Sequence, residues 1–215
     1  MKKIVLVMAG LTLTACSQNP ASNLSAVASL AGTAGVPGLS AGQSVDAGTL
    51  VQKLNLTMAN MNKAQEYTLA AFGKKKEAEE AASRAKFFET GNSVDAEVLQ
   101  KTGDTNAEID KLTESNKKLN AEGKKTLSLA MPYYSKSMLQ SAGLGMQMEQ
   151  AVGTISTNPT ALLAGPYKAK DLITVFTASP KLLSQMATTT HHLVTYSSSN
   201  GVDAKEVNAS FENVK

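Results

Sequence analysis

Apolar side chains recur every three or four residues over most of the chain beyond residue 48, which is the spacing of an amphipathic helix. The first stripe consists of Leu50, Leu54, Met58, Met61, Ala64 and Leu69. It continues through a run of strong helix formers, 74–86, to Phe87 and Phe88. β-Branched and aromatic residues cluster only at 173–176 and 193–196, and each cluster is shorter than the helical pattern around it. The sequence therefore predicts an all-α fold, a bundle of about five to seven helices.

A charge-rich region overlaps the end of this first pattern. Residues 74–125 hold 22 charged side chains, 11 of each sign. Thr90-Gly91-Asn92-Ser93 predicts a helix end and a new start, and the second helix could be interrupted near Gly103. The apolar stripe of this second helix is thin: Val98, Ile109, Leu112 and Leu119. Two interpretations stay open, a charged helical hairpin that projects from the bundle and the outer faces of ordinary bundle helices.

The stretch 131–155 has the opposite character. Between residues 137 and 167, Glu149 is the only acidic or basic residue. Small residues such as Ser141 and Gly145 would let another helix approach closely. The stretch has a heptad-like seam: Met131, Tyr134, Met138, Ser141, Gly145, Met148, Val152 and Ile155. We therefore expect it to form the central helix of the bundle.

Proline and glycine mark the boundaries of the last helices. We expect a helix from Pro166 through Phe176, because proline is tolerated at the first helical position. Pro180 should open or kink the next helix, which ends at the Ser-Asn-Gly run 197–201. A last short helix is expected over 202–211.

The region before residue 49 lacks the helical pattern. From 17 to 48 the chain is rich in Ala, Gly and Ser, and Asp46 is its only charged residue. Its prolines and glycines discourage any long element. We expect a flexible tether over 16–48 and a single helical domain over 49–215. The alternative for the tether is a short helix that carries Leu24, Val27, Ala28 and Leu30.

The first sixteen residues have the organisation of a secretion signal. Lys2 and Lys3 provide a positive start, and a mostly apolar run extends from Ile4 to Leu13. This run is too short to cross ~30 Å of hydrocarbon as a mature helix. Two small residues then precede Cys16, the only cysteine of the chain. The tetrad Leu13-Thr14-Ala15-Cys16 resembles the lipobox of bacterial lipoproteins.

This resemblance implies that residues 1–15 are a signal peptide that is removed. It also implies a diacylglyceryl group on the Cys16 sulfur and an acyl chain on the new amino terminus. Such chains anchor a protein firmly, because each buried methylene contributes ~0.8 kcal/mol. Ser17 follows the cysteine where an aspartate would imply retention, so the resemblance implies an outer-membrane protein facing the periplasm. Attachment to the inner membrane and exposure at the cell surface remain alternatives.

Composition limits the partners of the mature chain. Removal of the signal would leave 19 Lys and Arg residues against 18 Asp and Glu residues. This balance does not predict the basic face that nucleic acid requires. Arg84 is the only arginine, so bidentate recognition of phosphate is also scarce. An acylated Cys16 could form no disulfide, so packing alone would stabilise the domain.

The residue types that carry catalysis or bind metals form no recognisable motif. His191 and His192 are the only histidines, and adjacent residues on a helix point about 100° apart, so they cannot hold one metal ion from one face. Gly143-Leu144-Gly145 lacks the Lys-Ser/Thr pair of a phosphate-binding loop. We therefore predict a protein that is not an enzyme, with no catalytic residue, no metal site and no cofactor besides the lipid on Cys16.

Methionine is the one residue type that suggests a binding surface. Its flexible thioether fills irregular gaps in a core, which is the favoured interpretation, and it also suits adaptable grooves. A groove for a partner helix or an apolar ligand would consist of Met138, Ser141, Gly145, Met146 and Met148.

These expectations together describe a lipoprotein anchored in the outer membrane through Cys16. Its predicted role is a non-catalytic binding or assembly accessory for an envelope protein complex, as the helical pilotins of secretins are. The alternative is a carrier that holds a lipid or a small hydrophobic ligand in a Met-rich helical cavity.

The anchor hypothesis predicts the effect of replacing Cys16. The Cys16→Ser variant should leave the outer-membrane fraction and appear in the soluble periplasmic fraction, because the acyl chains have no attachment site. Fractionation and intact-mass analysis measure this. An unmodified thiol in the natural chain, or a variant that still fractionates with outer membranes, would contradict the hypothesis.

Overall fold

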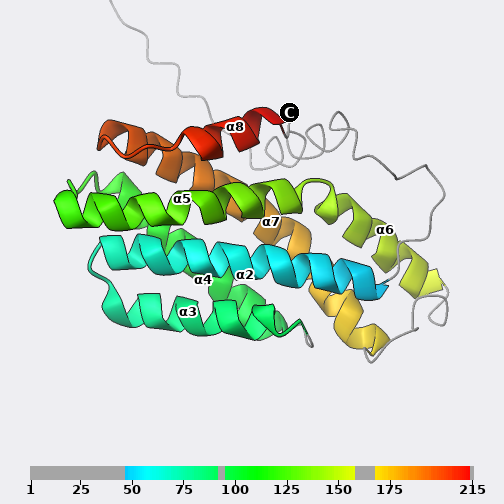
Figure 1. Ribbon diagram of the computed structural model, residues 1–215. Helices are drawn as coiled ribbons and strands as arrows, with labels where there is room; N and C mark the ends of the chain where they lie inside the picture. The colour runs from blue at the N-terminus through cyan, green and yellow to red at the C-terminus, as the bar shows by residue number, and fades with distance from the viewer. Residues whose placement is uncertain (1–46, 92–94, 158–167, 214–215) are drawn as a thin grey trace, which may run out of the picture.

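The computed structural model describes residues 47–91, 95–157 and 168–213. These residues form seven α-helices and, within the described ranges, no strand. The predicted all-α bundle is therefore confirmed (Figure 1). The helices are α2 (Ala47–Ala71), α3 (Lys75–Glu89), α4 (Ala96–Glu114), α5 (Ala121–Ser141), α6 (Leu144–Thr157), α7 (Ala169–Ser199) and α8 (Lys205–Asn213).

Helix α2 lies at the centre of the bundle. It packs mainly against α5 and α3, which flank it in Figure 1, and it also contacts α4 and α6. Helices α4 and α7 pack together behind this layer, and α8 covers α5 from the outside. More than half of the residues of α2 are buried, and they include Asn55, Asn62 and Gln65. The central helix of the bundle is therefore not the helix with the most apolar sequence, because polar residues share its buried surface.

The prediction that 131–155 forms one central helix is wrong. The helix stops at Ser141, and Gly143 has a positive φ of 71°, a conformation that favours glycine. The stretch thus gives two helices, α5 and α6, each with one exposed face. A positive φ of 80° at Gly73 similarly ends α2, so the stripe from Leu50 to Phe88 is divided between α2 and α3.

Two expected interruptions are absent from the described helices. Helix α4 continues through Gly103, where the missing side chain lets α7 approach. A Cβ atom there would lie 3.3 Å from a methyl carbon of Leu182. Helix α7 runs for 31 residues through Pro180, and Ser179 Oγ donates a hydrogen bond to the Val175 carbonyl just before it. Packing against α4 and α6 supports this long helix on both sides of the proline.

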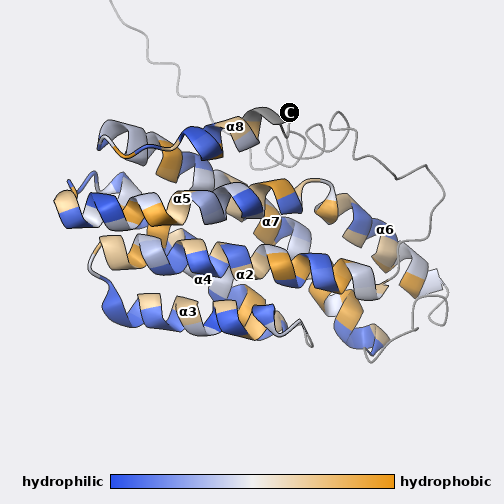
Figure 2. Ribbon diagram, viewed as in Figure 1, coloured by the Kyte–Doolittle hydropathy of each residue, from blue (hydrophilic) through white to orange (hydrophobic). Residues whose placement is uncertain are grey.

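The charge-rich helices do not project. Helix α3 packs against α2, and α4 packs against α7, so each covers a different inner helix. Ala78, Ala81 and Ala85 are the buried face of α3, and Ile109 on α4 is fully buried. The projecting-hairpin interpretation is therefore wrong, and the charges lie on the outer faces of bundle helices. Figure 2 shows this mixture of hydrophilic and hydrophobic positions along α3.

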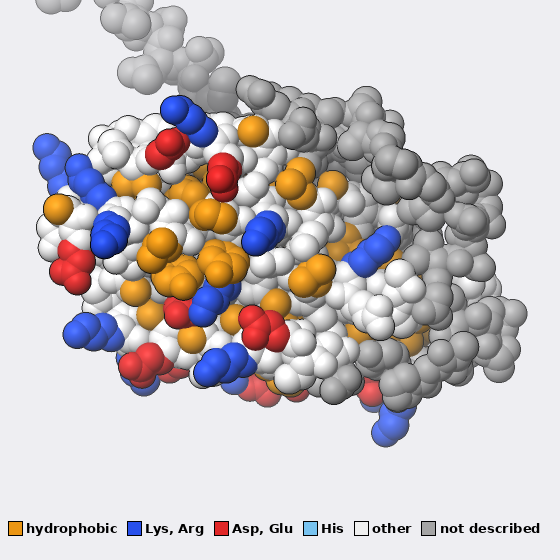
Figure 3. All heavy atoms as spheres, viewed as in Figure 1, with side chains coloured by type: hydrophobic (Ala, Val, Ile, Leu, Met, Phe, Trp, Pro, Cys, Tyr) orange, Lys and Arg blue, Asp and Glu red, His pale blue; other side chains and the backbone are white. Residues whose placement is uncertain are grey.

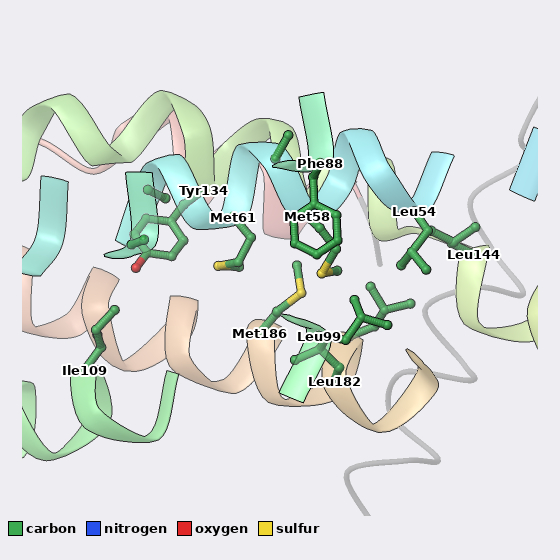
Figure 4. Close-up of a cluster of buried hydrophobic side chains, with 14 of the residues drawn as sticks. Leu54, Met58, Met61, Phe88, Leu99, Ile109, Tyr134, Leu144, Leu182 and Met186 are labelled. Carbon is green, nitrogen blue, oxygen red and sulfur yellow. The ribbon is translucent and has the colours of Figure 1, made fainter. Parts of the chain in front are cut away.

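Large side chains from six helices fill the core, as Figure 4 shows for its central part. Met58, Met61, Met148 and Met186 are all fully buried. Their flexible thioethers meet rigid neighbours such as Phe88 and fill the space between them. Most of the methionines thus serve packing.

One exposed face carries apolar groups between charged ones, over α2, α3 and α5 (Figure 3). Tyr67 and Tyr133 stack there with their ring centroids 5.8 Å apart, and Lys63 and Lys136 each lie over one of the rings. Leu56 is 54% exposed on the same helix as Tyr67. The α2–α5 seam is therefore amphipathic at its surface.

Two glycines give a matched test of the packing. A Cβ atom at Gly123 would lie 2.9 Å from the Ala71 carbonyl oxygen, so Gly123→Ala should lower the free energy of unfolding by about 1–3 kcal/mol. Gly153 has nothing within 4 Å of its Cβ position, so Gly153→Ala should raise it by roughly 0.5–1 kcal/mol through helix propensity alone. Urea unfolding measures both values, and effects of equal sign would contradict the packing at Gly123.

Candidate ligand-binding cleft

A cleft of about 690 Å³ opens between α4, α6 and α7. This volume lies in the range of small-molecule sites in proteins. Helix α7 forms one long wall, α4 forms the other, and α6 closes one side. The lining residues are Gly103, Asn106, Ala107, Asp110, Glu149, Val152, Phe176, Thr177, Pro180, Lys181, Ser184, Gln185 and Thr188.

Small residues on α4 create the space. Gly103 and Ala107 are one turn apart, so they lie on the same face of the helix, toward α7. They also line a second hollow of about 440 Å³, which extends toward the start of α4 and shares Lys181 and Gln185 with the first. The two hollows therefore lie next to each other along the α4–α7 interface.

The inner surface of the cleft is apolar. Phe176 is fully buried, and Pro180 lies one turn further along the same helix. Val152 of α6 is half-buried and packs against the core from the other side. An apolar molecule in the cleft would therefore contact a ring and two aliphatic side chains.

Polar side chains lie along the α4 wall. Asp110 Oδ1 lies 3.1 Å from His192 Nδ1, and Asp110 Oδ2 accepts a hydrogen bond of 3.0 Å from Thr189 Oγ1. Both carboxylate oxygens of Asp110 are thus engaged by α7. Glu149 and Lys181 are exposed at the rim and carry opposite charges.

A network of hydrogen bonds leads from the cleft to Arg84 of α3. Gln65 Nε2 donates to Asn106 Oδ1 at 2.7 Å and to the Thr102 carbonyl at 2.9 Å. Asn62 Nδ2 donates to Thr102 Oγ1 at 3.0 Å, and its own Oδ1 accepts from Arg84 Nε at 2.7 Å. This hydrogen-bonded network joins three helices, α2, α3 and α4.

Gln65 and Asn106 each leave one amide atom of this hydrogen-bonded network without a partner, and Asn106 is the one of the two that borders the cleft. It is 1% exposed and lines the cleft, yet its Nδ2 has no hydrogen-bond partner among the described residues. A buried amide group without a partner is costly, and native proteins rarely tolerate one. The Asn106 side chain, which borders the cleft, therefore carries a buried hydrogen-bond donor that no described residue satisfies.

Arg84 is the only charged residue in this hydrogen-bonded network. Its Nη2 donates to Thr105 Oγ1 at 2.8 Å, so its two hydrogen bonds go to neutral acceptors. Burial lowers the pKa of its guanidinium, and the nearby charge of Glu80 acts in the opposite direction. A guanidinium stays protonated in proteins, so Arg84 remains a cation held by the fork geometry of its donors.

The five residues of the predicted methionine groove do not line one surface. Met138 and Met148 are buried in the core, whereas Met146 is 38% exposed. Ser141 and Gly145 are half-buried, and Gly145 faces Pro180 and Leu183 of α7. The groove prediction is therefore corrected, because residues two apart on a helix, such as Met146 and Met148, point to different sides. Cys16 lies outside the described residues.

The two histidines point to different elements, as their adjacency predicts. His192 lies against Asp110 of α4, and the ring of His191 meets Phe211 of α8 edge-on at 6.0 Å. Across the described ranges, no group of three or more His, Cys, Asp or Glu side chains could hold a metal ion. None of the described helices is long and apolar enough to cross a membrane.

Sequence reasoning missed Gln65, Asn106 and the cleft. The positions of Asn62 and Gln65 could have indicated that they are buried, because both stand among the apolar residues of α2, next to Met58, Met61 and Leu69. A polar residue within a buried stripe needs a buried partner. The identity of that partner depends on which helix packs there.

Comparisons of the chain with protein-family models, with curated proteins and with solved structures found no match.

The two hydrogen bonds of Arg84 predict that a lysine at this position cannot maintain the stability of the protein. Arg84→Lys keeps the charge but cannot present two donors in a fixed plane, so it should lower the free energy of unfolding by about 1–2 kcal/mol. Lys86→Arg is the matched control, because Lys86 is exposed on the same helix and should change stability by at most about 0.5 kcal/mol. Chemical denaturation of both variants tests this. Equal stabilities would mean that the Asn62 and Thr105 contacts are dispensable.

Proposed function

We propose that this chain is a lipid-anchored, non-catalytic binding protein of the bacterial envelope, facing the periplasm from the outer membrane. The observation that carries the proposal is the sequence Leu13-Thr14-Ala15-Cys16 after a basic and apolar leader. The low-complexity stretch 17–48 supports it, because a tether there would separate the lipid from the helical bundle that begins with α2 at Ala47.

The arrangement around His192 supports a non-catalytic role. A nucleophilic hydroxyl must lie within hydrogen-bond reach of the base that activates it. Here Thr189 donates to Asp110, the same carboxylate that His192 contacts. The hydroxyl and the imidazole thus share an acceptor, which favours a structural link between α4 and α7.

The cleft favours a second candidate function, which is ligand carriage. A carrier with a Met-rich internal cavity is not what the core supports, because Met58, Met61, Met148 and Met186 are buried in it. The α4–α6–α7 cleft provides a different place for a small molecule. In both roles a membrane-anchored protein binds a partner without catalysis. The partner is an envelope protein in the first role and a small molecule in the second.

Site-specific photo-crosslinking in intact cells tests the assembly role. Photoreactive residues are placed singly at Leu56, Lys76 and Asn208, three exposed positions on different helices. A protein that serves one complex should give one dominant envelope product from one of these faces, because an interface covers only part of the surface. The Cys16→Ser background should weaken that product, since the chain would no longer be held at the membrane.

Deletion of the chain should also lower the amount of the complex that contains the crosslinked protein. A uniform, weak pattern from all three positions, with no complex affected by deletion, would contradict the assembly role.

A further inference from the structure

We propose that the α4–α6–α7 cleft binds an uncharged small molecule that has an apolar body and a carbonyl or hydroxyl oxygen, and that this oxygen accepts a hydrogen bond from Asn106 Nδ2. The inference rests on the proposed binding function and names the ligand class of that site. Its test uses purified protein, so it can fail without affecting the membrane anchor.

The orientation of the Asn106 amide follows from its neighbours. The Thr102 carbonyl oxygen can only accept, so the Gln65 atom that lies 2.9 Å from it must be the NH₂ group. The same NH₂ group lies 2.7 Å from the Asn106 amide, which must therefore present its oxygen to Gln65. Rotating the Asn106 amide by half a turn would set two NH₂ groups against each other. The free end of Asn106 is thus a donor, and a ligand must supply an acceptor.

The charges around the cleft disfavour an anionic acceptor. Asp110 and Glu149 line the cleft together with one lysine, Lys181. A ligand carboxylate or phosphate at Asn106 would lie on the same helix face as Asp110, one turn away, and like charges repel at this distance. A neutral oxygen avoids this repulsion.

A cationic ligand has no open partner at the inner wall. Asp110 already contacts His192 through one oxygen and Thr189 through the other. Glu149 is exposed at the rim, where solvent screens an ion pair. The ligand is therefore held by apolar contact and by one buried hydrogen bond.

Phe176, Pro180 and Val152 define the apolar half of the ligand. They lie on α7 and α6, opposite the α4 wall that carries Asn106. A molecule that spans the cleft would place its oxygen toward α4 and its hydrocarbon surface toward α7. This separation of one polar point from an apolar surface is typical of sites for small amphipathic ligands.

Two fluorescent probes test the proposal on the full chain carrying Cys16→Ser, which has no lipid to bind the dyes. Prodan is a neutral naphthalene with one ketone oxygen, and phenylnaphthylamine is a similar apolar dye without any oxygen. Each is titrated against the parent protein, against Ala107→Phe, which fills the exposed mouth of the cleft, and against Asn106→Leu, which removes the donor at similar volume. Ala209→Phe, at an exposed position on α8, is the matched control.

The parent should bind both dyes, and Ala107→Phe should weaken both by about tenfold or more, since the ring occupies their space. Asn106→Leu should weaken prodan by about fivefold and blue-shift its emission, but change phenylnaphthylamine by at most about twofold, because only prodan accepts the hydrogen bond. Ala209→Phe should change neither.

Each other result overturns the proposal. Absence of prodan binding, or binding that Ala107→Phe leaves intact, would show that the cleft is not the site. Equal changes for the two dyes in Asn106→Leu would show that water alone satisfies Nδ2. Circular dichroism establishes that each variant is folded, and Asn106→Asp, with a similar shape, replaces the leucine variant if that one unfolds.

Discussion

Burial of more than half of the residues of α2 is the constraint on which the rest of the structure depends. The polar residues on its buried face cannot reach water, so Asn62, Gln65 and Thr68 must find partners on the helices that pack around it. They do so on α3, α4 and α5. Arg84 donates to Asn62, Thr102 accepts from Asn62, and Asn106 accepts from Gln65. The hydroxyl of Tyr134 lies 3.3 Å from that of Thr68. These contacts specify which helix lies where, a choice that apolar contact alone leaves undetermined.

The same constraint links the interior to the cleft. Gln65 has one NH₂ group, and it serves both Thr102 and Asn106, so the amide of Asn106 is turned with its donor away from α2. Small residues on α4 leave space along the same helix as Asn106, and the apolar residues of α7 and α6 close the opposite wall. In the proposed site, the unpartnered amide nitrogen of Asn106 lies where this polar network ends. The orientation of that amide is set by Gln65, within the core.

The proposed membrane anchor and the cleft would be separate features of one chain. The anchor would fix the compartment through a few residues at Cys16, and it constrains nothing in the bundle. The bundle, in turn, could bind its ligand or partner without the lipid. Such a division is consistent with a tether between them, because neither part requires a fixed orientation of the other.

The sequence by itself determined the helical class, the helix end near Thr90 and the divergence of His191 from His192, because each follows from spacing along one helix or from local turn residues. It did not determine which helix is central, since Asn62 and Gln65 look like surface residues until α3 and α4 are placed against them. The break at Gly143 and the continuity of α7 through Pro180 were likewise decided by packing, which selects among backbone conformations of similar local energy. The cleft could not be predicted at all, because Asn106, Val152 and Phe176 are far apart in the chain and meet only through the contacts between helices.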